Sequence, residues 1–503
     1  MLHREKGRAL YEINTRVWLG ELSSRHSRQI TLANVPPEEV ERLADLGFDL
    51  VWLMGVWRVG EKSIEVARTH EGLQKEYRHV LPDYKGEDVI GSPYSVAEYD
   101  VAPFLGGMKG LVIFRNLLAR KGVGLILDFV PNHTGVDHRW VTQRPEYYIQ
   151  GDEGDLKREP GNYFKVKTAQ GDKIIAHGRD PYFPGWTDTG QINVFHPGTR
   201  SGLQNVLTSM AGQCDGVRCD MAMLVLSDVF QRTWGERAVK GVEAPVKDEF
   251  WAKAIHAVRE KHPRFLFIAE AYWGLEGKLQ ELGFDFTYDK TLYDRLRHGS
   301  ASEIRAHLEA PRDHQCRNLR FLENHDEERA ASAFSADRHR AAAVVAGTTP
   351  GLTLVHDGQL EGRKAKLPVQ LRRRPNESVD AAIRDFYERL LHELKDPTYW
   401  RGKWQVLPVS AAWEGNPTWD NFIAYQWEAQ GNGTRWVVVN FGPTQGQCYM
   451  KIDNRLLEGK KVELFDLLGS AQYLRDGSEL LSKGLYLDMP SFGYHVFRVS
   501  VKG

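Results

Sequence analysis

Cysteine is scarce in this sequence, whose 503 residues contain four, at 214, 219, 316 and 448. They show neither a regular pairing nor a Cys-x-x-Cys spacing, which excludes a disulfide or zinc framework as the organising feature. Net charge is also low, at −1, whereas nucleic-acid-binding proteins carry a clear cationic excess. The arginines at 372–374 are interpreted as solvated surface. No nucleic-acid partner is expected.

Long apolar runs are absent as well, and the sequence predicts no leader peptide. No apolar stretch approaches the roughly 18 residues that a membrane-spanning helix needs. The start, Met1-Leu-His-Arg-Glu-Lys6, is charged and has no apolar stretch behind it, unlike a secretory signal. We therefore expect a cytoplasmic, reduced protein without a membrane partner.

Strand-like and helix-like segments alternate through the first 396 residues. Eight apolar runs read as strands, at 9–18, 50–54, 123–130, 215–220, 265–270, 283–286, 319–323 and 351–355. Such βα alternation predicts an open doubly wound sheet or a closed (β/α)8 TIM barrel. The number of strands favours the barrel. No Gly-x-Gly-x-x-Gly follows the first strand, which disfavours a dinucleotide-binding sheet.

Two stretches depart from this alternation. Residues 131–198, after the third strand, are rich in Gly, Pro, Asp and Tyr and too long for a simple loop, so they predict a small inserted domain. Residues 397–503 contain β-branched, alternating runs separated by Gly and Asn turns, which predicts an all-β sandwich domain. The catalytic barrel is then formed by residues 1–130 and 199–396.

Polar residues end several of the predicted strands. Active sites of barrels lie at the carboxyl ends of the strands. The candidates there are Asp128 with Asn132 and His133, Arg218 with Asp220, Glu270, and Asn324 with His325 and Asp326. Several converging carboxylates suit either a metal site or a glycosidase, in which one carboxyl acts as acid/base and another as nucleophile. Taken singly, an Asp after a strand is more often a cap or turn residue, and a lone His more often structural.

The order and spacing of these clusters resemble the α-amylase family, glycoside hydrolase family thirteen. The motifs that carry the resemblance are Asp128-Phe-Val-Pro-Asn-His133, Gly216-Val-Arg-Cys-Asp220, Glu270 and Glu323-Asn-His-Asp326, with Gln191-Ile-Asn193 near the end of the predicted insert. The resemblance extends from the first strand to beyond residue 360. It implies the same barrel, insert and terminal β-sandwich.

The resemblance also implies a role for each acid. Asp220 would be the nucleophile, Glu270 the general acid/base, and Asp326 the carboxylate that holds sugar hydroxyls and stabilises the transition state. An oxocarbenium-like transition state is stabilised by nearby anions, and burial beside anions helps Glu270 to keep its proton. Arg218, on the same strand face as Asp220, would keep that carboxylate ionised and oriented.

Further residues are implied around these acids. By similarity His133 and His325 bind hydroxyls of the sugar that is cleaved, Tyr94 stacks beneath it, and Asp128 braces Arg218. Asn132 and Asn324 support the loops. Tyr272 and Trp273 directly follow the acid, and they are expected either to stack on the leaving-group side or to pack in the core.

Two positions depart from the family pattern. Met223-Leu224 stands where many α-amylases carry a Lys-His pair that contacts the leaving-group side, which argues against endo-acting behaviour on long polymers. Asn132 occupies the place of a calcium ligand, but residues 131–198 offer no convincing acidic partner. No cofactor is expected to be required, and Ca²⁺ binding is left open.

The expected activity is that of a retaining glycoside hydrolase that cleaves α-1,4 bonds in maltooligosaccharides or glycogen- and starch-type glucans. A 4-α-glucanotransferase with the same covalent intermediate is the first alternative. A catalytically silent carbohydrate-binding relative is disfavoured because all three acids are present. A barrel metalloenzyme is the remaining alternative. The sequence leaves the oligomeric state and the endo or exo mode of attack open.

Overall fold

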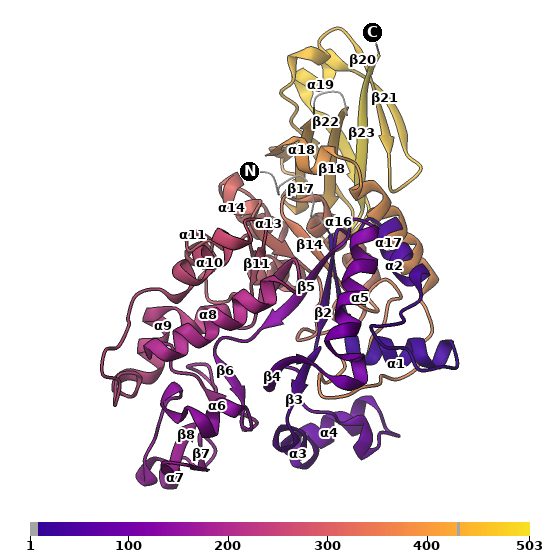
Figure 1. Ribbon diagram of the computed structural model, residues 1–503. Helices are drawn as coiled ribbons and strands as arrows, with labels where there is room; N and C mark the ends of the chain where they lie inside the picture. Colours follow the sequence, from indigo (N-terminus) through magenta and orange to yellow (C-terminus); the bar gives the residue numbers. More distant parts are fainter. Residues whose placement is uncertain (1–8, 430–432, 503) are drawn as a thin grey trace.

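The computed structural model describes residues 9–429 and 433–502 (Figure 1). The charged start at 1–6, on which the expectation of no secretory signal rests, lies outside the described residues. Within the described ranges, no helix combines the length and the apolarity that crossing a bilayer requires.

Eight parallel strands close into a barrel in the order β1-β14-β13-β12-β11-β10-β5-β2. Their bounds are β1 Ala9–Asn14, β2 Leu50–Met54, β5 Gly124–Phe129, β10 Gly216–Cys219, β11 Leu266–Ala269, β12 Phe286–Tyr288, β13 Asn318–Arg320 and β14 Leu352–His356. Their apolar runs suit strands that are covered on both faces. The barrel, with its helices and an antiparallel C-terminal sheet, confirms the predicted fold class.

Helices cover the outside of the barrel (Figure 1). They include α1 Thr15–Arg25, α2 Pro37–Asp45, α5 Gly107–Arg120, α8 Pro197–Ala211, α9 Ser227–Trp234, α10 Phe250–Lys261, α11 Glu276–Glu281, α12 Lys290–His298, α13 Ala301–Leu308, α16 Ala336–Thr348 and α17 Ala381–Leu394. The first strand ends earlier than the sequence predicts. Asn14 is the reason, because its side chain accepts a hydrogen bond from the Val17 amide (3.4 Å) and so begins α1.

Two excursions lie at the carboxyl ends of the barrel strands, opposite the C-terminal sheets (Figure 1). The first follows β2 and contains β3 Trp57–Val59, α3 Glu61–Thr69, α4 Glu71–Val80 and β4 Val96–Val101. The second follows β5 and contains β6 His133–Gly135, α6 Arg139–Gln143, α7 Glu153–Arg158, β7 Tyr163–Thr168, β8 Gly171–Ala176 and β9 Thr189–Gln191. These elements lie within residues 131–198, and the exact limits of the three domains stay a prediction.

The C-terminal part contains a six-stranded sheet, β15-β17-β18-β23-β20-β21, and a three-stranded sheet, β16-β19-β22. The strands are β15 Lys403–Val406, β16 Val409–Ala411, β17 Phe422–Ala429, β18 Gly433–Asn440, β19 Gly446–Met450, β20 Lys461–Asp466, β21 Gln472–Asp476, β22 Leu485–Met489 and β23 Tyr494–Lys502. Along β17, Tyr425 and Trp427 belong to the barrel core, whereas Phe422 and Ala424 pack in a second core with the smaller sheet. This alternation follows from the period of two in a strand.

Candidate active site

A pocket of about 510 Å³ lies at the carboxyl ends of the barrel strands. Six of the residues predicted for the site line it, namely Tyr94, His133, Asp220, Glu270, Tyr272 and Asp326. Its volume falls within the range of small-ligand pockets, about 300–1,000 Å³. Residues from more than 200 positions apart in the chain therefore meet at the end of the barrel where the sequence predicts a site.

Arg218 is the buried centre of this site. Its Nη1 lies 2.9 Å from Asp220 Oδ1, and its Nη2 lies 2.8 Å from Glu270 Oε2. Period-two alternation along β10 sends both Arg218 and Asp220 to the barrel interior. Asp128, in the neighbouring strand β5, lies 3.5 Å from Nη1. One guanidinium thus compensates three buried carboxylates.

Glu270 is held by two further donors. The Met221 amide donates to Oε2 (2.6 Å), and the Tyr272 hydroxyl donates to Oε1 (2.9 Å). Met221 adopts a left-handed backbone conformation, with φ at +42°, which is uncommon for a residue other than glycine. This turn directly after Asp220 brings the amide beneath the second carboxylate. The sequence carries no signal for that contact.

Burial governs the protonation of these acids. It raises the pKa of Asp220 to about 8, opposed by Arg218 and assisted by the charge of Glu270. Burial also raises the pKa of Asp128 to about 6, against the attraction of Arg218. Because neighbouring carboxyl groups of like charge resist joint ionisation, the cluster of acids around Asp220 retains a proton at neutral pH. A nucleophile and a proton donor need that protonation state.

His325 connects the pocket to the inside of the barrel. Its Nε2 lies 2.7 Å from the Tyr94 hydroxyl and 2.9 Å from Asp326 Oδ2, and its Nδ1 donates to Glu12 Oε1 at 2.5 Å. Burial lowers the pKa of His325, but Asp326 and Glu12 together raise it well above its ordinary value. Burial would raise the pKa of Asp326, yet His325 lowers it overall. His325 is therefore an imidazolium between two carboxylates.

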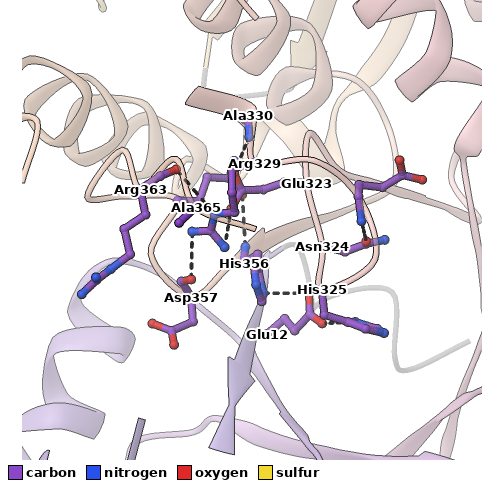
Figure 2. Close-up of polar contacts among 12 residues, drawn as sticks. Glu12, Glu323, Asn324, His325, Arg329, Ala330, His356, Asp357, Arg363 and Ala365 are labelled. Atoms are coloured by element: carbon purple, nitrogen blue, oxygen red, sulfur yellow. Dashed lines mark hydrogen bonds and ion pairs between the residues drawn. The ribbon is translucent and has the colours of Figure 1, made fainter. Parts of the chain in front are cut away.

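Figure 2 shows the polar layer behind His325. Glu12, in β1, contacts His356 of β14 at 3.1 Å through its second carboxylate oxygen. Asn324 accepts hydrogen bonds from the amides of Asp326 and Glu327, both at 2.9 Å, and so fixes the loop that carries Asp326. The side-chain oxygen of Asn324 therefore holds this loop, and its supporting role in the site stays a prediction.

His133 and Asn132 lie where the inserted segment meets the barrel. The His133 ring lies 5.1 Å from the Trp186 ring, and burial lowers the pKa of His133 to about 4, so the ring is neutral. Gln191 donates from Nε2 to both Asn132 oxygens, at 2.9 and 3.0 Å. Among the described residues, no group of three or more His, Cys, Asp or Glu side chains is arranged to hold a metal. The Gln191 amide nitrogen, a donor, lies against both Asn132 oxygens, and no cluster of acidic side chains among the described residues joins them, so the residues around Asn132 do not fit a calcium ion.

The residues after Glu270 form an exposed rim. Trp273 is 44% exposed and has a positive φ of +64°, and the edge of its ring lies against Tyr182 of the inserted segment, with centroids 5.2 Å apart. Tyr182 is 70% exposed. Trp273 is thus not a core residue, whereas Tyr272 is largely covered and bonded to Glu270.

Met223 and Leu224 are fully buried in the short 3-10 helix Ala222–Val225 and do not line the pocket. Met221 lines it instead. Glu12 is not among the predicted site residues. A usable signal for it is that a carboxylate within an apolar strand needs a partner, because an unpaired buried charge is costly. The roles inferred for the individual site residues remain predictions.

The sequence of residues 37–401 matches the family described as alpha amylase, catalytic domain. Alpha-amylase MalA of Haloarcula japonica is 22% identical over 86% of this chain and 55% of its own, and Alpha-amylase 3 of Dictyoglomus thermophilum is 23% identical over 57% of each chain. The chain thus spans about half the length of these curated relatives. The crystal structure of a maltogenic alpha-amylase, AmyB from Thermotoga neapolitana, covers 100% of both chains with a TM-score of 0.70 and 18% identity, which shows a shared fold. Since the family match takes in most of the barrel, the inserted segment and all of the strand-end clusters, the chain belongs to the α-amylase family.

Proposed function

We propose that the protein is a retaining glycoside hydrolase that cleaves α-1,4-glucosidic bonds in maltooligosaccharides or in glycogen- and starch-type glucans. The observation that carries the proposal is the guanidinium of Arg218, which contacts both Asp220 (2.9 Å) and Glu270 (2.8 Å). Retaining enzymes need their two carboxyl groups close, about 5–5.5 Å apart, because one of them attacks the sugar directly.

In the proposed reaction Asp220 attacks the anomeric carbon while Glu270 gives its proton to the glycosidic oxygen, so that the leaving sugar departs with that proton. A covalent glycosyl-enzyme results. Glu270, now a carboxylate, takes a proton from a water molecule that attacks the same carbon and releases Asp220. Asp326 and the imidazolium of His325 would bind hydroxyls of the reacting sugar, and Tyr94 would stack beneath it.

Product stereochemistry tests this mechanism directly. Proton NMR of freshly hydrolysed maltoheptaose is expected to show the α-anomer first, because two displacements restore the configuration. Asp220→Asn should lower kcat by at least about a thousandfold without a loss of fold by circular dichroism. Arg232→Ala, an exposed change in α9, is the matched control and should keep full activity. The β-anomer as first product, or an active Asp220→Asn variant, would contradict the proposal.

A 4-α-glucanotransferase remains the second candidate, and the exposed pair Trp273 and Tyr182 favours it, because flat rings suit an acceptor sugar. Incubation with maltoheptaose distinguishes the two. Hydrolysis yields only shorter sugars, whereas a transferase also produces sugars longer than the substrate.

A further inference from the structure

Two segments distant in sequence close one side of the pocket, and we name them the cap: residues 61–91, with α3 and α4, and residues 367–374 after β14. The pocket surface on this side is mostly apolar. Its lining comprises Val66, Ala67, Leu73 and Val369, with His70 and Gln370 as the polar members.

The cap is a packed unit rather than a loose loop. Tyr77, Leu81, Val89 and Leu371 are buried together in a core of their own. The Ile90 amide donates to the Gln370 carbonyl at 2.9 Å, and Val89 pairs with Leu371 as an isolated antiparallel bridge. The two segments therefore hold each other in place beside the pocket.

The inserted segment continues the same wall. Ser63 of α3 donates to the backbone carbonyl of Asp188 at 3.1 Å, and Ser95 donates to the same carbonyl at 2.7 Å. The Lys62 amide donates to Asp137 Oδ2 at 3.0 Å. Asp188 itself lines the pocket together with Trp186. The wall thus runs from the cap to the insert, joined by these hydrogen bonds.

The two sides of the pocket differ in openness. The wall is next to Tyr94, which follows the cap directly in the chain and contacts His325, on the side where the reacting sugar would bind. Beyond Glu270, by contrast, the side chains of Trp273, Tyr182 and Phe183 are 44%, 70% and 68% exposed. One side is a wall whose cap part is mostly apolar, and the other is an open aromatic rim.

From this contrast we propose that the protein attacks glucan chains from their non-reducing ends and releases a short unit, an inference that rests on the proposed function. A longer glycone would press hydroxyl groups against Val66, Leu73 and Val369, which offer no hydrogen-bond partner. His70 and Gln370 can bond only some of these groups, and desolvation without full compensation is costly. The remainder of the chain would leave over Trp273 and Tyr182, where rings can stack on successive sugars.

A pair of substrates tests the inference. The protein is given p-nitrophenyl maltoheptaoside and the same compound with a 4,6-O-ethylidene block on its non-reducing end, and products are followed by chromatography. We expect cleavage of the free substrate and an at least about tenfold lower rate on the blocked one, since the blocked end would have to lie against the apolar residues of the cap. Comparable rates on both would overturn the exo inference and leave the hydrolase proposal standing. Cleavage of neither would overturn both.

Loosening the cap should relax this preference. Leu371→Ala removes a buried side chain from the core of the cap, and we expect the ratio of blocked to free rates to rise at least about threefold. Leu464→Ala, an equally buried change in the C-terminal sheets, is the control and should leave the ratio unchanged. Thermal unfolding of both variants verifies that each remains folded. A folded Leu371→Ala protein with an unaltered ratio would show that the cap does not limit the glycone.

Discussion

Glu12 is the residue whose contacts best explain the charge of the site. It is completely buried inside the barrel, and its two oxygens face His325 at 2.5 Å and His356 at 3.1 Å (Figure 2). The two histidines hold the pKa of Glu12 far below its ordinary value, against the effect of burial. Its negative charge in turn keeps His325 protonated, so that Nε2 donates toward Asp326. Glu12 is a positioning residue, since it acts through His325.

Replacement of Glu12 by Gln should therefore change the pH profile as well as the rate. Gln still accepts from Nδ1 of His325, but without the negative charge the imidazolium is less stable. We expect kcat/KM to fall about tenfold at pH 7, with a larger loss at higher pH as His325 becomes neutral. Arg232→Ala, an exposed change in α9, is the control and should keep the wild-type profile. Equal pH profiles for the Glu12→Gln and wild-type proteins would refute the charge argument.

The proton shared among the acids around Asp220 sets a second pH dependence. A pKa of Asp220 near 8 means that this cluster of acids loses that proton as pH rises through that value. No proton donor then remains for the leaving group, so kcat/KM should fall about tenfold per pH unit above roughly pH 8. Rates on maltoheptaose between pH 5 and 10 measure this, with circular dichroism at each pH to verify folding. A flat profile up to pH 10 would be incompatible with the shared proton.

At this scale, the motifs predicted which residues meet, but not how they are held. Asp220, Glu270 and Asp326 could be found because each follows an apolar strand, and barrel geometry brings such positions together. The amide of Met221 and the carboxylate of Glu12 could not be assigned, since these contacts depend on one backbone turn and on one pair of side chains across the barrel.

Among the elements, the short pair β6–β9 attaches the inserted segment to the barrel. His133 pairs with Gln191, whose side chain donates to both oxygens of Asn132. Gln191 is fully buried, so each of these hydrogen bonds is shielded from water. This amide contact attaches the inserted segment to the barrel at the position where the family resemblance suggests a calcium ion.

We therefore expect activity that is insensitive to chelators and a stability that depends on Gln191. Treatment with EDTA should leave both kcat and the melting temperature unchanged. Gln191→Ala should lower the free energy of unfolding by about 1–3 kcal/mol, because buried carbonyl groups lose their donor. Gln445→Ala, an exposed change in the C-terminal sheets, is the control. A drop in melting temperature on adding EDTA to the wild-type protein would mean that a cation is bound after all.

Helices and strands with strong periodicity can be predicted, whereas segments that pack against distant parts of the chain cannot. The helix α2 can be predicted from the sequence, because Pro37 suits the start of a helix and Val40 and Leu43 lie on one buried face. The cap cannot, because its core joins Tyr77 to Leu371 across nearly 300 residues, and neither segment shows the apolar run of a barrel strand. Loop segments of this kind owe their shape to tertiary contacts.

At the scale of the whole molecule, the barrel and the six-stranded sheet share one hydrophobic core. Tyr425 and Trp427 of β17 and Val437 of β18 are buried together with the barrel residues. The Trp427 indole donates to the carbonyl of Thr348 at 2.7 Å, and the Tyr425 hydroxyl lies 2.6 Å from the Thr348 hydroxyl. Separate domains usually meet through smaller, more polar interfaces. The sequence marks the change of composition near Pro397 but gives no sign of this shared core.

The shared core predicts that barrel and sheet unfold together. Trp427→Ala should destabilise the whole chain by about 3–5 kcal/mol, because it leaves a cavity between the two parts. Scanning calorimetry should then show one transition in the wild-type protein and one, at lower temperature, in the variant. Trp436→Ala is the informative comparison, since Trp436 is equally buried but packs in the second core, between the two C-terminal sheets. Trp427→Ala could instead give two transitions, the later one at the wild-type melting temperature. If cleavage of maltoheptaose were lost only in that later transition, the barrel would be stable without the sheet. The apolar side chains of α13 and α16 that the sheet covers make that outcome costly, because a barrel without the sheet would expose them to water.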